Sequence, residues 1–183
     1  ATIGASAAVL TILIAPAGVR PVRAAESNLL VTEAVIDGPA DVIWRLITTK
    51  EGMESWIVPH AEIDFRAGGL VRTNHDPAGR IGDANTITNR ILALRPKQMV
   101  SIQVADTPDA IPFAQTIVGT RYQILLPPLP DGKTRVRCEG RGFDGGPMGF
   151  AARTFMYQGG NLVLEKLRAA VAGQTTGGAA KRR

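Results

Sequence analysis

The chain of 183 residues has few of the residues that build metal centres or covalent cross-links. Its only cysteine is Cys138, which excludes a disulfide within the chain and a zinc site made of several cysteines. Its two histidines, His60 and His75, are far apart in the sequence and have no other ligands at matching spacing. We therefore expect no metal site, and no feature of the sequence implies a cofactor.

A basic folded surface is also missing. The formal net charge is +5, but two arginines precede residue 26 and three basic residues end the chain, and between them Lys+Arg and Asp+Glu are equal in number. Nucleic-acid binders carry their positive charge on the folded domain, so nucleic-acid binding is not expected. The hydrophobic share of 45% and the charged share of 20% are typical of a globular domain.

Residues 3–17 contain no charge and have about the length of the hydrophobic region of a signal peptide. Small residues follow at Ala24 and Ala25, where a signal peptidase could cut. We therefore expect export, to the periplasm or the medium, with a mature domain from Glu26. An uncleaved membrane anchor and a buried helix stay open as alternatives, and they would leave the protein membrane-anchored or cytoplasmic. Contact with a membrane is expected only through this segment.

The remaining chain predicts one domain over 26–172 and a flexible basic tail over 173–183. Residues 28–36 are apolar and β-branched and predict a strand. Two short helices should follow, one starting at Pro39 in its first turn and one started by a Thr48–Glu51 capping box and reaching Trp56.

Alternating apolar and polar residues then predict antiparallel strands. We place them at 60–66, 70–74, 83–94, 99–104, 113–126 and 134–142. Gly68 and Gly69 predict the turn of the first hairpin, with positive φ at one or both. In the last strand Val136 and Cys138 share an apolar face, so Cys138 is interpreted as a small core residue.

A long helix over 147–172 should close the domain. Its apolar residues fall near one face and are Phe150, Tyr157, Leu164, Leu167 and Val171. Gly159 and Gly160 interrupt it, each at a cost of about 1 kcal/mol in helix propensity. Two roles would explain glycine at these positions: close packing of the helix against the sheet, or space for a ligand. The expected fold class is α+β: a curved antiparallel sheet of about six to seven strands wrapped on the C-terminal helix, with two short helices after the first strand.

Four short motifs occur in this order. They are Val42-x-Trp44, the Thr48–Trp56 helix, Asp64-Phe65-Arg66-Ala67-Gly68-Gly69 and Leu94-Arg95-Pro96. Together they resemble the family related to the activator of the 90-kDa heat-shock-protein ATPase, in the START-like, helix-grip (SRPBCC) superfamily with its polyketide cyclase/dehydratase-like relatives. The resemblance spans roughly residues 28–171. It implies a helix-grip fold whose relatives bind lipids, hormones and polyketides in a cavity. Because the shared motifs are structural, it assigns no catalytic residue.

Six aromatic, aliphatic and basic side chains on otherwise apolar stretches are the candidate cavity residues. They are Trp56, Phe113, Ile117, Arg121, Arg153 and Tyr157. An arginine in an apolar cavity needs an anionic partner, which a ligand carboxylate would supply. The alternative is that Arg121 and Arg153 lie on the surface.

We therefore expect a protein that binds an apolar or amphipathic small molecule between the sheet and the C-terminal helix. Two alternatives stay open, an enzyme of cyclase or dehydratase type and a co-chaperone-like ATPase activator. A cavity with two or more desolvated titratable groups would favour the enzyme, whereas at most one polar anchor would favour binding alone. The sequence carries no signal for ligand identity or oligomeric state.

Overall fold

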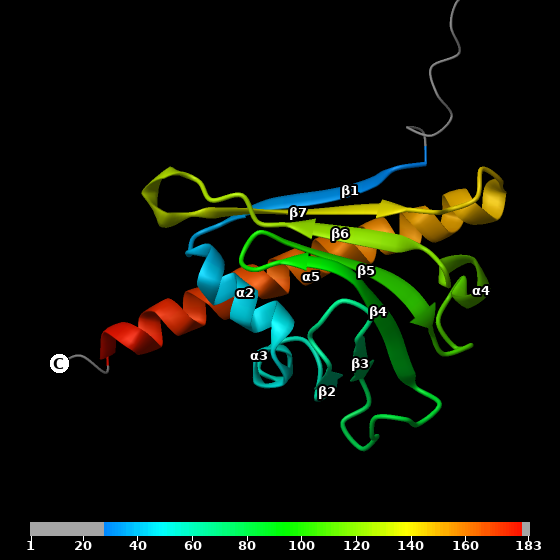
Figure 1. The fold of residues 1–183 in the computed structure, drawn as a ribbon, viewed down its shortest axis with the longest axis horizontal. Coiled ribbons are helices and arrows are strands. Elements are labelled where there is room, and N and C mark those ends of the chain that lie inside the picture. The colour runs from blue at the N-terminus through cyan, green and yellow to red at the C-terminus, as the bar shows by residue number, and fades with distance from the viewer. Residues whose placement is uncertain (1–27, 181–183) are drawn as a thin grey trace, which may run out of the picture.

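A single antiparallel sheet of seven strands forms the body of the protein, and one long helix crosses it (Figure 1). The computed structural model describes residues 28–180, with side chains described through residue 174. In chain order the elements are β1 (Leu30–Ile36), α2 (Ala40–Thr48), α3 (Lys50–Glu54), β2 (His60–Ile63), β3 (Leu70–Asn74), β4 (Thr86–Arg95), β5 (Met99–Asp106), α4 (Ala114–Ile117), β6 (Arg121–Leu125), the 3₁₀ turn η1 (Pro130–Gly132), β7 (Thr134–Arg141) and α5 (Pro147–Ala180). This is the α+β helix-grip arrangement that the sequence predicted.

The strands follow the order β1-β7-β6-β5-β4-β3-β2, so the first strand pairs with the last. Leu30 lies opposite Gly140 and Ile36 opposite Thr134. Burial alternates along β1, with Thr32 and Ile36 buried and Glu33 exposed, because successive side chains of a strand point to opposite faces. One face of β1 and β7 therefore packs inward against α5, and the other faces solvent.

The ends of the chain differ from the sequence analysis in one respect. The predicted signal-like segment, 1–25, lies outside the described residues. Helix α5 continues past the expected end at Ala172 to Ala180, so it occupies most of the stretch predicted as a flexible tail. Within the part of the chain that the structure describes, no helix combines the length and the apolar character needed to cross a membrane.

The predicted strand over 113–126 is wrong in its first half. Ala114–Ile117 is the short helix α4, and the strand β6 begins only at Arg121. Phe113 has φ +64° and Gly119 has φ +88°, and these left-handed conformations break an extended chain on both sides of α4. β-Branched residues suggested a strand here, but Ile117 instead anchors the helix in the core, where it is 3% exposed.

The helix α3 begins one residue later than predicted. Thr49, rather than Thr48, is its N-cap and accepts a hydrogen bond from the Gly52 N–H at 3.0 Å. Thr48 ends α2 instead, and its hydroxyl donates to the Trp44 carbonyl. The capping-box pattern matches Thr48 with Glu51, but the neighbouring Thr49 is the cap that forms, so the pattern located the helix but not its first residue.

Two apolar clusters lie between the sheet and the helices. One joins α2 to the C-terminal half of α5 and consists of Ile36, Ile43, Leu46, Leu126, Val136, Leu164, Leu167 and Val171. The other joins the sheet to α4 and to the start of α5 and consists of Leu30, Val104, Ile117, Tyr122, Phe143 and Ala152. β1 contributes to both clusters, which makes it the common wall of the core.

The buried face of α5 agrees with the predicted one in its C-terminal half, where Leu164, Leu167 and Val171 are buried, but not in its N-terminal half. Phe150 is 62% exposed and Tyr157 49% exposed, whereas Ala152 is fully buried. From Ala152 through Gly160 to Leu164, the inward positions recur at multiples of four residues. Four residues turn an α-helix by about 400°, so this stripe winds around the helix and leaves the heptad-spaced Phe150 and Tyr157 outside.

The two central glycines of α5 have different surroundings. A Cβ at Gly160 would lie 3.1 Å from Thr32 Cγ2, because the helix backbone approaches β1 closely there. A Cβ at Gly159 would have no atom within 4 Å. Close packing therefore explains Gly160, and nothing in its contacts explains Gly159.

We predict that Gly159→Ala raises the free energy of unfolding by about 0.5–1 kcal/mol, because alanine is the better helix former and has room. Gly160→Ala should gain less or be destabilising, because its methyl group presses on Thr32. Urea denaturation of the two variants side by side measures the difference. Equal gains would show that the helix does not contact β1 this closely.

The β2–β3 hairpin also contains two neighbouring glycines with different surroundings. Gly68 has φ +82° and open space around its Cβ position, whereas a Cβ at Gly69 would lie 2.0 Å from the Asp64 carbonyl oxygen. Gly69 thus has its own steric reason to lack a side chain.

We predict that Gly69→Val lowers the free energy of unfolding by more than about 1 kcal/mol and by more than Gly68→Ala, which introduces only the strain of a positive φ. Denaturation midpoints of both variants provide the check. An unchanged midpoint for Gly69→Val would mean that the turn is open in solution.

Candidate ligand-binding groove between β1 and α5

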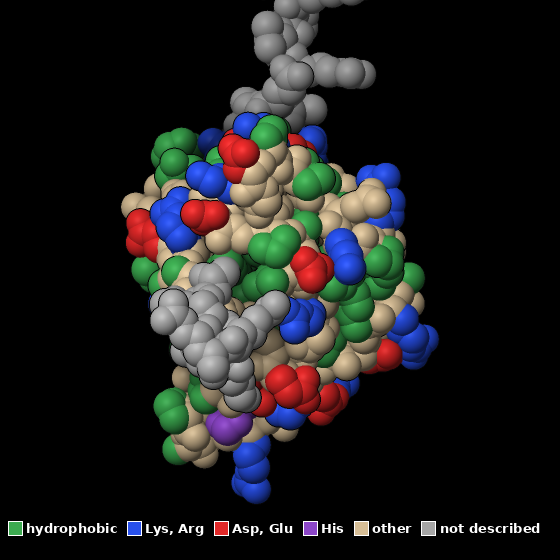
Figure 2. Space-filling view, turned by 90° about the vertical axis from the view of Figure 1, so that its left-hand side faces the viewer, with side chains coloured by type: hydrophobic (Ala, Val, Ile, Leu, Met, Phe, Trp, Pro, Cys, Tyr) green, Lys and Arg blue, Asp and Glu red, His purple; other side chains and the backbone are tan. Residues whose placement is uncertain are grey.

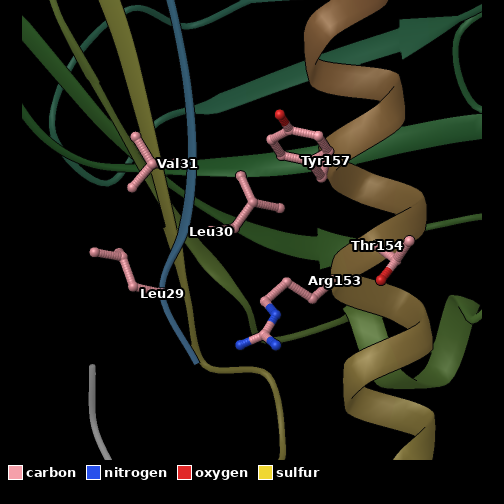
Figure 3. Close-up of a pocket in the computed structure, with 6 residues that line it drawn as sticks. All are labelled: Leu29, Leu30, Val31, Arg153, Thr154 and Tyr157. Carbon is pink, nitrogen blue, oxygen red and sulfur yellow. The ribbon is translucent and has the colours of Figure 1, made fainter. Parts of the chain in front are cut away.

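A groove lies between the strand β1 and the N-terminal half of α5 (Figure 3). It has a volume of about 370 Å³ and is open to solvent on one side. Six residues line it: Leu29, Leu30, Val31, Arg153, Thr154 and Tyr157. Four are apolar or largely apolar, and one carries a charge.

The groove exists because β1 is an edge strand. Its inner face is covered by α5, which comes closest at Gly160. Tyr157 lies about one turn and Arg153 about two turns earlier in the helix. Figure 3 shows both side chains and that of Leu30 pointing into the space between strand and helix. A neighbouring strand would have filled this space, so the edge position of β1 keeps it open.

Arg153 is the charged group of the groove. It is partly buried, and its Nη1 donates to the Asn28 side-chain oxygen at a distance of 3.5 Å, which is long for a hydrogen bond. Its guanidinium carbon lies 5.5 Å from the centre of the Phe150 ring, within the range of a cation–π contact. These neighbours hold the guanidinium at the groove.

The structure brings together only two of the six residues predicted for the cavity, Arg153 and Tyr157. Trp56 packs against the cluster around α2, and its Nε1 donates to the Leu46 carbonyl at 3.0 Å. Arg121 is exposed at the start of β6, opposite Arg141. The alternative that these arginines lie on the surface therefore applies to Arg121 but not to Arg153.

Phe113 and Ile117 lie away from the groove, at α4. The Phe113 ring is 5.9 Å from the Phe155 ring of α5. Both residues contribute to the cluster that contains Tyr122. The sequence analysis placed them on a strand facing the cavity, and the formation of α4 changes their position.

Sequence reasoning missed the β1 side of the groove, Leu29 to Val31, and Thr154. The segment 28–36 was identified as a strand, but its position at the edge depends on pairing with β7, more than a hundred residues away. No local signal marks an edge strand that a helix flanks. Thr154 lies one turn before the exposed Tyr157 and carries no distinctive pattern.

The titratable groups with shifted pKa values lie outside the groove. Burial raises the pKa of Tyr122 to about 12 and that of Cys138 to about 11. Both groups are therefore protonated at neutral pH, and the Cys138 thiol is a poor nucleophile. Burial, followed by the charge of Lys166, lowers the pKa of His75. None of these groups forms an acid–base pair with a residue of the groove.

A second hollow is polar. It has a volume of about 400 Å³ and lies where β4 begins and β5 ends, with Asp83, Asp106, Asp109 and Arg72 in its lining. In the described range 28–180, no group of three or more His, Cys, Asp or Glu side chains is arranged to hold a metal ion.

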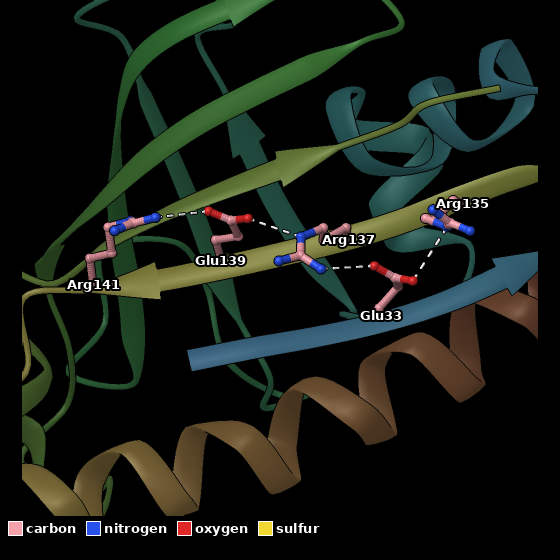
Figure 4. Close-up of polar contacts among 5 residues, drawn as sticks. All are labelled: Glu33, Arg135, Arg137, Glu139 and Arg141. Atoms are coloured by element: carbon pink, nitrogen blue, oxygen red, sulfur yellow. Dashed lines mark hydrogen bonds and ion pairs between the residues drawn. The ribbon is translucent and has the colours of Figure 1, made fainter. Parts of the chain in front are cut away.

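The outer face of β1 and β7 carries alternating charges (Figure 4). Glu33 pairs with Arg135 at 3.3 Å and with Arg137 at 3.0 Å. Glu139 pairs with Arg137 at 2.9 Å and with Arg141 at 3.1 Å. The charged face of β7 was predicted from its alternation, and its pairing with β1 completes the row. Basic, acidic and apolar side chains are also interspersed on the face shown in Figure 2.

Comparison with solved structures supports the fold. Protein MLL2253 from Mesorhizobium loti is 22% identical with a TM-score of 0.63, over 79% of this chain and 96% of its own. The Aha1 dimer from Colwellia psychrerythraea is 17% identical with a TM-score of 0.54, over 75% and 92%. DynU16, from the dynemicin biosynthetic locus, is 12% identical with a TM-score of 0.58, over 78% and 46%. At these identities the likeness concerns the fold alone.

No curated protein matches the sequence. The family model described as "Activator of Hsp90 ATPase homolog 1-like protein" matches residues 37–172, from the turn before α2 into α5. This range contains the motifs on which the resemblance was recognised, and it covers well over half of the chain. The chain therefore belongs to the family of Activator of Hsp90 ATPase homolog 1-like proteins.

Proposed function

We propose that this protein binds an apolar or amphipathic small molecule with an anionic group in the groove between β1 and α5. The observation that carries the proposal is the lining itself: Leu29 to Val31 of β1 on one wall, Tyr157 of α5 on the other, and one guanidinium, that of Arg153. An apolar ligand body would pack between this segment of β1 and the ring of Tyr157, and its anionic end would bind Arg153.

The size of the groove supports a small molecule. Its volume of about 370 Å³ falls at the lower end of the usual range of ligand pockets, about 300–1,000 Å³. Tyr157 adds an aromatic wall whose ring is half exposed without a ligand. A ligand would cover this surface, and aromatic side chains contribute strongly to binding because they bury large areas.

The enzyme alternative has less support. It requires at least two desolvated titratable groups in the site, and the groove offers a partly buried guanidinium and a half-exposed phenol. An arginine stays protonated and cannot serve as a general base at neutral pH. Binding without catalysis therefore fits the groove better.

We predict that Tyr157→Ala weakens the binding of 1-anilinonaphthalene-8-sulfonate at least several-fold and leaves the protein folded. Because Tyr157 is 49% exposed, its truncation leaves no filled core position empty. Trp56→Ala, in contrast, should lower the free energy of unfolding by about 3 kcal/mol. Fluorescence titration and a melting curve on the same samples measure both effects.

The control for Tyr157→Ala is Leu162→Ala, which removes an exposed apolar side chain of α5 outside the groove. It should leave the affinity unchanged. Unchanged affinity in a folded Tyr157→Ala protein would exclude this face of α5 from the site.

We predict that Arg153→Gln lowers the affinity for the same anionic probe about tenfold, the loss of one charge-assisted hydrogen bond. Its affinity for the neutral probe N-phenyl-1-naphthylamine should not change. Arg168→Gln, at an exposed position of α5, serves as the charge-matched control. If both arginine variants lose the same affinity, the anionic probe responds to net charge rather than to the groove.

A further inference from the structure

The hydroxyl of Tyr122 has no hydrogen-bond partner among the described residues, although the residue is only 8% exposed. A phenol that packs in an apolar core usually finds a partner, because an unpaired buried hydroxyl loses its hydrogen bond to water without replacement. Thr120, whose hydroxyl lies nearby on the same strand face, donates to the Ile117 carbonyl at 2.6 Å. The Tyr122 hydroxyl thus makes no hydrogen bond of normal geometry, and a polar neighbour within reach is the hydroxyl of Thr120.

Packing does not require this hydroxyl. The ring of Tyr122 lies over Gly140 of β7, where a Cβ would come within 2.7 Å of its Cε1, and it meets the Phe143 ring edge-on at 6.5 Å. The other residues of the cluster, such as Val104 and Ala152, are also apolar. A phenylalanine would make the same contacts and leave no polar atom unpaired.

Leu30 connects this hydroxyl to the groove. It lines the groove and belongs to the cluster around Tyr122. The Cβ position of Gly140 that touches the Tyr122 ring lies only 3.3 Å from the Leu30 Cβ. The side chain of Leu30, which is 3% exposed, therefore stands between the groove and Tyr122.

Two partly exposed side chains lie beside the same cluster, Cys138 on β7 and Met156 on α5. Leucine and methionine side chains change rotamer easily, and methionine fills irregular spaces well. A ligand that displaced the side chain of Leu30 would enter this cluster beside the ring of Tyr122.

We propose that the Tyr122 hydroxyl is an interior hydrogen-bond donor for the ligand of the β1–α5 groove, an inference that rests on the proposed function. It would donate to a carbonyl oxygen carried by the buried part of the ligand, while Arg153 binds the anionic group at the mouth. The ligand class is then an apolar acid that also bears a ketone or ester carbonyl. The raised pKa of Tyr122, about 12, agrees with this role, because the phenol keeps its proton and can only donate it in a hydrogen bond.

The test compares Tyr122→Phe with the unchanged protein, using two neutral probes. One is 6-propionyl-2-(dimethylamino)naphthalene, which carries a ketone whose hydrogen bonding moves its emission to longer wavelength. The other is N-phenyl-1-naphthylamine, which has no carbonyl. Neither carries a charge, so neither depends on Arg153.

We expect Tyr122→Phe to lower the affinity for the ketone probe about fivefold, the loss of one neutral hydrogen bond. The bound emission should shift to shorter wavelength, and the affinity for N-phenyl-1-naphthylamine should stay the same. The melting temperature without probe should be unchanged or higher, because the variant removes an unpaired buried group. Thr73→Val, which removes a buried hydroxyl on β3, is the control and should change neither affinity.

The inference is overturned if Tyr122→Phe is folded and binds the ketone probe with unchanged affinity and emission, or if the unchanged protein does not bind this probe. It is distinguished from the proposed function by the anionic probe. If binding of the anionic probe depends on Arg153 but binding of the ketone probe does not depend on Tyr122, the proposed groove stands. Only the proposed interior donor is then excluded. Failure of all three probes to bind the unchanged protein removes both.

Discussion

The contact between α5 and β1 is the constraint on which the rest of the structure depends. β1 begins the described fold and pairs with β7, so the sheet is complete only when the two ends of the domain meet. Helix α5 follows β7 directly and packs on the inner face of β1, where Gly160 allows its backbone to approach Thr32. Because β1 supplies Leu30 to one apolar cluster and Ile36 to the other, both clusters depend on this contact.

The groove and the buried hydroxyl result from the same arrangement. A strand inside a sheet has neighbours on both sides, but β1 has one, and the helix that covers it leaves a space at the level of Tyr157 and Arg153. The inner wall of that space is a single side chain, Leu30. Behind it lies the only buried side-chain polar atom that lacks a partner in the described part of the chain. The proposed site thus combines an open mouth with an interior donor, and the walls of both belong to the core.

Much of this fold could be predicted from residue patterns. The alternation in 134–141 located β7 and its charged face, and the spacing of the short helices located α2 and α3. The other features depend on pairing between distant segments, which local patterns do not predict. The edge position of β1 depends on residues far away in the sequence, and the inward face of α5 depends on how its stripe winds across a twisted sheet. Phe150 and Tyr157, seven residues apart, indicated an inward face. The small residues Ala152 and Gly160 lie inward instead, because they allow the helix to pack closely on the sheet. The sequence therefore predicted two of the groove residues, Arg153 and Tyr157. The wall formed by Leu29–Val31 could be recognised only in the structure.

The charged row on the outer face keeps one carboxylate of β7, that of Glu139, ionised as the pH falls. Hydrogen bonds from Arg137, and next from Arg141, hold the pKa of Glu139 below its ordinary value. A carboxylate with a lowered pKa stabilises the fold fully above the ordinary glutamate pKa and loses this contribution only as the pH falls through the lowered value. Glu139 therefore stays charged between its two arginines at a pH where an ordinary glutamate is already protonated, and the arginines of β7 do not yet face one another without a counter-charge.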